Sequence, residues 1–185
     1  MSEAEAGAVV PDTKDWTWTL ERPCPDCGFV AGEVARADLT GVLAAVTAPW
    51  AEVLRRPDAT ARPAPSTWSP LEYGCHVRDV CRLFDERVRL MQDHDDPTFD
   101  DWDQDATAVR DRYGEQDPAV VAAGLAEGAA GWGRTLAAVP DDAWERTGRR
   151  SNGSLFTVLG LGRYGLHDLA HHLHDVGAAP VSTTS

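Results

Sequence analysis

Histidine is the residue type whose positions in this sequence best indicate chemistry. Of six histidines, four fall close together near the C-terminus: His167, His171, His172 and His174. A helix turns about 100° per residue, so His167 and His171 would stand one turn apart on nearly the same face. Two imidazoles with this spacing can hold one divalent metal ion between them. The spacing therefore predicts a metal site that needs a further ligand from another helix.

His76 is the expected third ligand, because it lies within the apolar stripe of an earlier helix. That stripe consists of Tyr73, Val77, Val80, Leu83 and Phe84. A neutral imidazole among apolar side chains needs a partner for its nitrogens. We therefore predict that His76, His167 and His171 bind one divalent metal ion. His172, which would project beside Asp168 and Asp175, is predicted to be solvated.

Two other patterns in the sequence resemble known metal-binding motifs. His167-Asp168-Leu169-Ala170-His171 is one methylene away from the zincin motif His-Glu-x-x-His, but Asp168 is expected to project away from the metal. The spacing of Asp101, Asp103 and Asp105 resembles the start of a calcium loop, but the required glycine and glutamate are missing. Calcium binding is therefore rejected.

Cys24-Pro25-Asp26-Cys27 forms the one Cys-x-x-Cys pair in the sequence. Without a second pair, a closed four-cysteine zinc site within one chain is not predicted. The alternatives are structural packing, which is the more frequent, and a pair of accessory redox thiols. Cys75 adjoins His76 but would project about 100° away from it, so it is not counted as a ligand.

The elements that must position these residues are four amphipathic helices, and the predicted fold class is an all-α four-helix bundle. Helical periodicity predicts helices over residues 30–54, 70–91, 118–139 and 152–176. Ser69, Pro70 and Glu72 form a capping box at the start of the second helix. A long acidic loop, 92–116, would contain some short helix. No strand is predicted.

Three segments are expected along the chain. Residues 1–28 would be an N-terminal arm lying on the domain, with Trp16 and Trp18 as anchors. Residues 29–177 would be the bundle domain. Residues 178–185 would be a flexible tail.

The formal net charge of -13 argues against nucleic acid and anionic membrane surfaces as partners, because both attract clustered Lys and Arg. No stretch approaches the roughly 20 apolar residues of a membrane span, and residues 1–20 lack the pattern of a secretory signal. With four cysteines, expected to be reduced, the sequence predicts a cytoplasmic protein. A homodimer is compatible with the sequence, which does not fix the oligomeric state.

Two segments of the chain resemble the DinB superfamily, near its mycothiol-dependent maleylpyruvate isomerase and thiol S-transferase branch. Trp68-Ser69-Pro70-Leu71-Glu72-Tyr73-Gly74-Cys75-His76 is similar to the family's Trp-Ser-x-x-Glu-x-x-x-His helix start. Tyr164-Gly165-Leu166-His167-Asp168-Leu169-Ala170-His171 is similar to its closing His-x-x-x-His. The similarity extends from about residue 29 to 176.

This resemblance implies a four-helix bundle with a three-histidine site for zinc, nickel or a similar ion, and the ligands carry over to His76, His167 and His171. It also implies S-transfer with a low-molecular-weight thiol, which would be mycothiol. The isomerase relatives carry a glutamate at one ligand position. Because His167 stands at that position here, the isomerase interpretation is weakened.

The preferred function is therefore metal-dependent transfer of a low-molecular-weight thiol to a small electrophile. Tyr73 and Arg163 would lie near the metal and orient the substrate, the arginine by binding a carboxylate. The alternatives are a non-catalytic, stress-associated metal-binding module and a metal-dependent hydrolase or cyclase in which water replaces the thiol. An open metal position beside a cleft would favour an enzyme.

Overall fold

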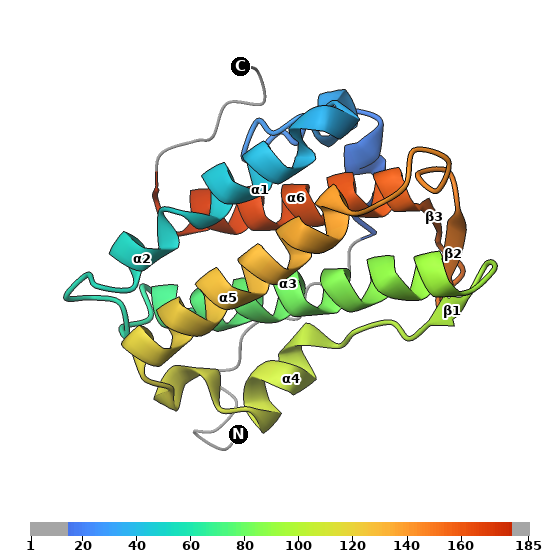
Figure 1. Cartoon of the computed structure of the whole chain (residues 1–185). Helices are drawn as coiled ribbons and strands as arrows, with labels where there is room; N and C mark the ends of the chain where they lie inside the picture. Colours follow the sequence, from blue (N-terminus) through green and yellow to red (C-terminus); the bar gives the residue numbers. More distant parts are fainter. Residues whose placement is uncertain (1–14, 179–185) are drawn as a thin grey trace.

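The computed structural model describes residues 15–178, so the first half of the predicted arm and residues 179–185 of the predicted tail lie outside the described residues. Four helices form a bundle (Figure 1): α1 (Leu39–Thr47), α3 (Pro70–Asp93), α5 (Pro118–Ala137) and α6 (Val158–Asp175). Both α1 and α3 pack against α5 and α6, which gives the order α1-α5-α3-α6 around the bundle. The predicted four-helix bundle is confirmed.

The two longest helices begin at the residues that the sequence indicates. The Ser69 hydroxyl accepts a hydrogen bond from the Glu72 backbone, and the Glu72 carboxylate accepts one from the Ser69 backbone, which completes the capping box of α3. Asp117 caps α5 by accepting bonds from two backbone amides of its first turn. The cap at Ser69 fixes where α3 begins, and therefore the position of His76 along the bundle axis.

The helix predicted over residues 30–54 is wrong as a single element. The structure divides it into short 3-10 turns at Ala31–Glu33 and Arg36–Asp38, helix α1, and α2 (Trp50–Val53). Pro49 separates α1 from α2, because proline lacks the amide hydrogen that a continuous helix would use. Thr47 Oγ1 donates to the Leu43 carbonyl at 2.7 Å near the end of α1.

A small sheet is present where no strand was predicted. It contains β1 (Thr98–Phe99), β2 (Thr147–Arg150) and β3 (Leu155–Thr157), with β1 parallel and β3 antiparallel to β2. Asn152 and Gly153, interpreted as the start of the last helix, instead form the turn between β2 and β3, with Gly153 at φ +97°. Asn-Gly is a strong signal for a β-hairpin, because both residues readily adopt the positive φ that tight hairpin turns require. Helix α6 begins only after Thr157, whose hydroxyl accepts from Gly160 N.

The acidic loop after α3 contains α4 (Gln104–Arg110), so the predicted short helix is confirmed. The end of the last helix was also predicted correctly: α6 stops at Asp175, and Gly177 follows with φ +64°. Inside the bundle, α6 lies so close to α3 and α5 at Gly165 that an added Cβ would stand 2.7 Å from the rings of Phe84 and Trp132.

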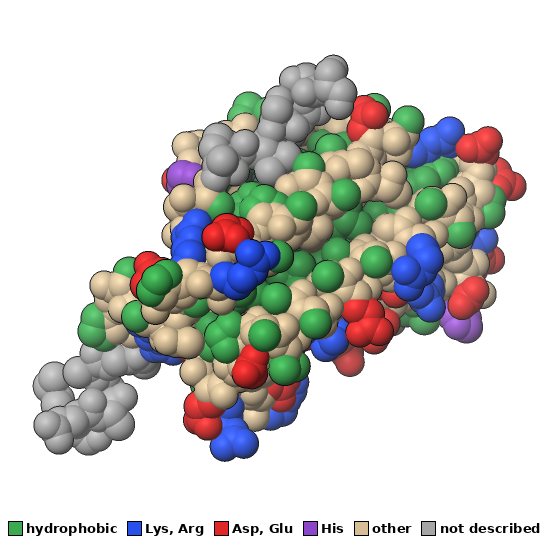
Figure 2. Space-filling model, turned by 60° about the vertical axis from the view of Figure 1, so that its left-hand side comes forward, with side chains coloured by type: hydrophobic (Ala, Val, Ile, Leu, Met, Phe, Trp, Pro, Cys, Tyr) green, Lys and Arg blue, Asp and Glu red, His purple; other side chains and the backbone are tan. Residues whose placement is uncertain are grey.

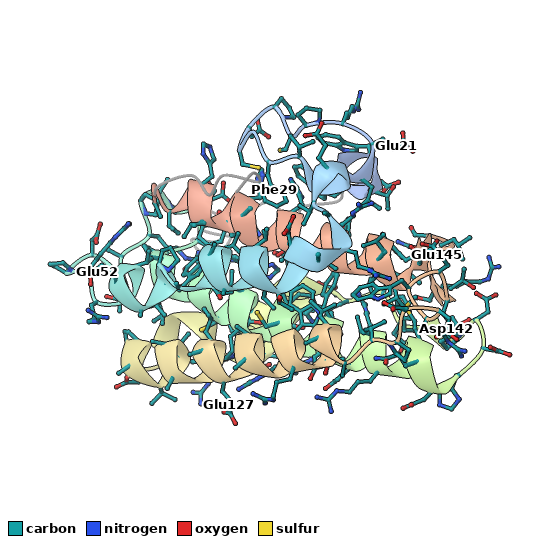
Figure 3. All side chains as sticks on the ribbon, turned by 45° about the horizontal axis from the view of Figure 1, so that its top comes forward. Glu21, Phe29, Glu52, Glu127, Asp142 and Glu145 are labelled. Carbon is teal, nitrogen blue, oxygen red and sulfur yellow. The ribbon has the colours of Figure 1, made fainter. Side chains whose placement is uncertain are left out.

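The described part of the arm lies along α6. Its 3-10 turn Thr17–Leu20 and the following turn Ala31–Glu33 both contact α6. Phe29, only 3% exposed, marks the place where the arm meets α6 (Figure 3). Trp16, one of the two predicted anchors, packs against the rings of His167 and His171. The described arm is therefore a covering for one face of α6.

Acidic and basic side chains are interspersed over the face shown in Figure 2, and hydrophobic side chains are visible in the depressions between its helices. Within residues 15–178, no helix combines the length and the apolar character that a membrane crossing requires.

Candidate metal centre

Two separate groups of side chains that could bind a metal ion lie on different faces of α6, and the predicted ligands are divided between them. One group contains His76, Asp168 and His172; the other contains Cys24, Cys27, His167 and His171. Within each group the potential ligand atoms lie within 4.8 Å of one another. Among the described residues, His76 is thus grouped with neither His167 nor His171.

The rotation of α6 about its axis explains the division. The side of α6 that faces the bundle is the buried stripe Val158, Leu161, Gly165, Leu166, Leu169 and Leu173. Asp168 and His172 flank this stripe on the side of α3, whereas His167 and His171 fall on the far side, under the arm. An apolar stripe of Phe156, Leu159 and Ala170 also fits helical spacing, and it would place His167 and His171 beside the core. Phe156 belongs to β3, and the other two are only partly buried.

Asp168 connects the two histidines of the first group. Its Oδ1 lies 3.1 Å from His76 Nε2 and 3.7 Å from His172 Nε2. As expected, Asp168 lies on a different face of α6 from His167 and His171, but it contacts His76, and the expectation that His172 is solvated is wrong. His172 Nδ1 contacts Asp175 Oδ2 at 2.9 Å. In the tautomer that donates this bond, Nε2 keeps its lone pair toward Asp168, which is the usual arrangement behind a metal-binding histidine.

His76 is fully buried and enclosed by aromatic rings. Trp102 stacks on it at 5.2 Å between centroids, Trp68 lies 5.6 Å away, and His172 meets it edge-on at 4.6 Å. Burial lowers the pKa of His76 against the opposing effect of Asp168. The imidazole is therefore neutral at neutral pH and able to bind a metal. Burial raises the pKa of Asp168, but its interactions with His76 and His172 outweigh burial and hold the pKa below the usual value.

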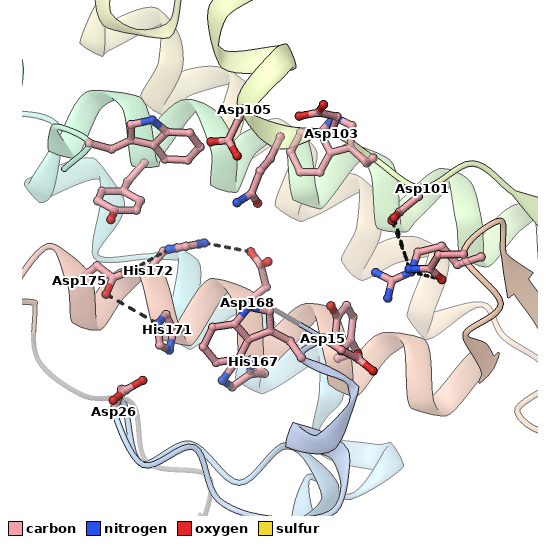
Figure 4. A pocket seen from close by; sticks show the side chains of 18 of the residues that line it. Asp15, Asp26, Asp101, Asp103, Asp105, His167, Asp168, His171, His172 and Asp175 are labelled. Carbon is pink, nitrogen blue, oxygen red and sulfur yellow. Dashed lines mark hydrogen bonds and ion pairs between the residues drawn. The ribbon is translucent and has the colours of Figure 1, made fainter. Parts of the chain in front are cut away.

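Two residues of the first group, Asp168 and His172, line a pocket of about 940 Å³ (Figure 4), whereas His76 is fully buried behind them. His167, Asp168, His171 and His172 line one wall from α6, and Asp105 lies across the pocket from them, whereas the Asp103 carboxylate caps α4. Acidic side chains dominate the lining, with one arginine, Arg150, among them. The aspartates are Asp15, Asp26, Asp101, Asp103, Asp105, Asp168 and Asp175. In the sequence, Asp101, Asp103 and Asp105 were interpreted only as a possible calcium loop.

The two predicted substrate-binding residues have different outcomes. Tyr73 lines the pocket, and its ring packs against His172 at 5.1 Å. Burial, followed by the charges of Asp175 and Glu72, raises the pKa of Tyr73 to about 12, so its hydroxyl stays protonated. Arg163 is held elsewhere, because its Nε donates to the Val34 carbonyl at 2.9 Å. Arg150, 3.5 Å from Asp101, is the arginine that lines the pocket.

The second group joins the arm to α6. Cys24 Sγ lies 3.6 Å from His171 Nδ1, and Cys24 is 1% exposed. His167 is 4% exposed, and its Nε2 has no hydrogen-bond partner among the described residues. Burial, together with the neighbouring Cys24, raises the pKa of the Cys27 thiol to about 12. The Cys-x-x-Cys pair therefore lies beside two histidines and not beside a second cysteine pair, the partner considered in the sequence.

Comparisons with known proteins agree with this fold. The model of the DinB superfamily matches residues 31–176. Among solved structures, one similar chain is described as "YfiT from Bacillus subtilis is a probable metal-dependent hydrolase with an unusual four-helix bundle topology". It is 21% identical over 78% of this chain and 89% of that one, with a TM-score of 0.65. A search of curated proteins found no significant match.

Proposed function

Since this chain belongs to the DinB superfamily, we propose that it is an enzyme that depends on a divalent metal held by His76, Asp168 and His172. The proposed reaction transfers a low-molecular-weight thiol to a small electrophile. The observation that carries the proposal is a group of two imidazoles and one carboxylate, of which Asp168 and His172 line an open pocket. Because the pocket lies directly beside these side chains, an enzyme is favoured over a module that only binds metal.

The donor set fits a divalent ion. Two histidines and one carboxylate are the protein ligands of many catalytic zinc sites and of non-haem iron sites, both of which keep an open position. His76 is neutral and Asp168 ionised, which are the protonation states that metal binding requires. A metal bound there would act as a Lewis acid and lower the pKa of a thiol or water molecule in the pocket.

The remaining pocket residues would bind and orient the reactants. Trp68 and Trp102 enclose His76 and shield its side of the pocket from water. Tyr73 keeps its proton and can donate a hydrogen bond, whereas Asp105 lies across the pocket from Asp168. Arg150 can bind one anionic group of a substrate. The volume of about 940 Å³ is large enough for a thiol and a second small molecule together.

The acidic lining limits the substrate class. Carboxylates accept hydrogen bonds and attract cations, so a hydroxyl-rich thiol such as mycothiol, or an electrophile with an amino group, suits this pocket. The resemblance gives the isomerase relatives a carboxylate ligand, and Asp168 would supply one in the proposed site, so this donor set also suits the isomerase branch. A dicarboxylate substrate would nevertheless meet seven aspartates and one arginine, which disfavours it.

Metal-dependent hydrolysis is the second candidate. Its support is the similarity to the Bacillus subtilis protein described as a probable metal-dependent hydrolase. The same ligands would then activate water instead of a thiol. Asp105, across the pocket from Asp168, is a carboxylate that could act as the general base.

The test starts from protein purified anaerobically and analysed for metal, then incubated with mycothiol and a panel of small electrophiles. We expect mass spectrometry to detect a thioether product whose formation requires the enzyme and His76. Parallel reactions in ¹⁸O-labelled water identify hydrolysis. Label incorporation without any thiol adduct would replace the transferase proposal with the hydrolase.

A spectroscopic test uses cobalt in the same pocket. Adding thiol to the cobalt-loaded protein should produce a thiolate–cobalt charge-transfer band, which imidazole and water ligands do not give. Cys24→Ser/Cys27→Ser is the necessary background, because those thiols lie near other ligands and could produce a band by themselves. Absence of the band with every physiological thiol would contradict thiol activation.

A further inference from the structure

We propose that Cys24, Cys27, His167 and His171 form a second metal site, a closed zinc site that fastens the N-terminal arm to α6. It is distinct from the group around His76, because the two groups share no ligand; His167 and His171 also line the pocket, whereas neither cysteine does. The chemistry of the donors is also different, with two thiols here and none in the group around His76.

The arm presents both thiols from one tight turn. Cys24 N donates to the Phe29 carbonyl at 3.0 Å, and Gly28 N donates to the Cys24 carbonyl at 2.8 Å. Gly28 adopts φ +73°, which side chains rarely allow, so the chain can reverse directly after Cys27. This closed turn brings Cys27 to within ligand distance of Cys24 without help from a distant segment.

Helix α6 places His167 and His171 one helical turn apart, beside the chain reversal that follows Cys27. The Nε2 atom of His167 is buried and has no hydrogen-bond partner among the described residues. An unpaired buried nitrogen destabilises the fold unless it binds a ligand such as a metal ion. Phe29 and Trp16 cover the same histidine, with ring centroids 6.5 and 5.7 Å from it. The imidazole is therefore held in place and shielded from water, beside two thiols.

The distances suit zinc. With Zn–S bonds of about 2.3 Å and Zn–N bonds of about 2.0–2.1 Å, a tetrahedral centre separates a sulfur and a nitrogen ligand by roughly 3.6 Å. The separation between Cys24 Sγ and His171 Nδ1 is 3.6 Å. No two ligand atoms of the group are more than 4.8 Å apart. They are therefore at most about 1–1.5 Å farther apart than in a tetrahedral zinc site, a difference that side-chain torsions can take up. Two thiolates and two imidazoles in tetrahedral geometry select zinc over harder cations.

Zinc binding at this site would hold part of the pocket wall in place as well as the arm. The arm contributes Asp15, Trp16 and Asp26 to the pocket lining. On α6, His171 Nε2 lies 3.8 Å from Asp175, the carboxylate that also contacts His172. A zinc ion at the arm would therefore hold part of the pocket wall in place, with a structural effect on substrate binding.

The experiment counts zinc by mass spectrometry in the full chain purified under reducing conditions. We expect Cys24→Ser/Cys27→Ser to lose one zinc equivalent relative to the parent, and His171→Ala to lose the same equivalent. His174→Ala is the matched control on the same helix, because His174 is exposed and belongs to neither group, and it should lose none. Cobalt loading gives an independent readout: a thiolate charge-transfer band in the parent without added thiol, absent from the double cysteine variant.

Arm release gives a third readout. A glutamate-specific protease should cleave after the exposed Glu21 faster in the double cysteine variant than in the parent. Unchanged zinc content in that variant would overturn the proposal, as would a Cys24–Cys27 disulfide in the reduced, metal-supplied parent. Neither outcome depends on the pocket metal, which is tested separately by His76→Ala.

Discussion

His171 and His172 follow one another on α6, yet their rings are nearly perpendicular, at 84°, with centroids 5.9 Å apart. One ring turns toward the arm and the other toward α3, so consecutive residues belong to different donor groups. The carboxylate of Asp175 lies behind both, 2.9 Å from His172 Nδ1 and 3.8 Å from His171 Nε2. The helix thus separates the two groups while one side chain connects them.

The ligand assignment gives the first prediction. In the Cys24→Ser/Cys27→Ser background, where only the pocket metal should remain, His76→Ala or His172→Ala should remove the bound metal. His167→Ala should retain it, because His167 faces the arm. Metal content by mass spectrometry decides the matter. Loss with His167→Ala and retention with His172→Ala would restore the ligand set expected from the sequence.

The second prediction concerns Asp175. Its contact with His172 Nδ1 favours the tautomer whose Nε2 lone pair is available to the pocket metal. Asp175→Asn should therefore weaken metal binding by about 10–100-fold, the usual effect of removing such a partner. Competition with a chromophoric chelator measures the affinity. Exposed Asp141, which pairs with Arg36 far from the site, offers Asp141→Asn as a control that should leave it unchanged.

The third prediction concerns pH and the start of α3. Burial opposes ionisation of Glu72, but hydrogen bonds from Arg62 and Ser69 outweigh it and lower the pKa of Glu72 below its ordinary value of 4.5. A lowered folded-state pKa stabilises the fold above about pH 4.5, and this contribution is lost as pH falls through the folded-state value. Glu72→Gln should therefore lower the free energy of unfolding by about 1–3 kcal/mol at neutral pH.

Urea denaturation at several pH values measures this effect. The difference between Glu72→Gln and the parent should be constant above about pH 5 and shrink in more acidic solution. Glu127→Gln, at an exposed position of α5, is the control and should change little at any pH. A difference that persists unchanged in acid would show that Glu72 acts through packing and not through its charge.

The fourth prediction tests the close approach inside the bundle. Gly165→Ala would place a Cβ 2.7 Å from the rings of Phe84 and Trp132, so it should destabilise the protein by about 1–3 kcal/mol. Gly41→Ala in α1 meets no atom within 4 Å and should stabilise by about 0.5–1 kcal/mol. Thermal unfolding compares the two variants. Equal stability of both would mean that α6 can shift away from α3 and α5 at little cost.

The sequence predicted the helices wherever a local signal marks their ends. Ser69, Glu72 and Asp117 are caps that act through neighbouring backbone groups, and Gly177 ends α6 in the same local way. The hairpin at Gly153 carried an equally local signal that was assigned to a helix start. By contrast, α1 and α2 differ from a single helix through one proline, whose effect competes with a continuous apolar pattern.

The candidate site was predictable in its residue types but not in its grouping. The i,i+4 spacing fits His167 with His171 and equally fits Asp168 with His172, and the two choices differ by a rotation of about 100°. Only the packing of Leu161, Leu169 and their neighbours fixes that rotation. The contact between Cys24 and His171 spans 147 residues, so no local pattern could reveal it.

The boundary of the family match has a consequence for how this protein could diversify. The match begins at residue 31, whereas Asp15, Trp16 and Asp26 at the rim of the pocket precede it. The bundle supplies the proposed metal ligands of the pocket, and a segment outside the matched region supplies part of the pocket lining. Replacing that segment would change which compounds are admitted while the proposed ligands stay as they are. Proteins with the same bundle and a different leading segment should accordingly differ in selectivity before they differ in chemistry.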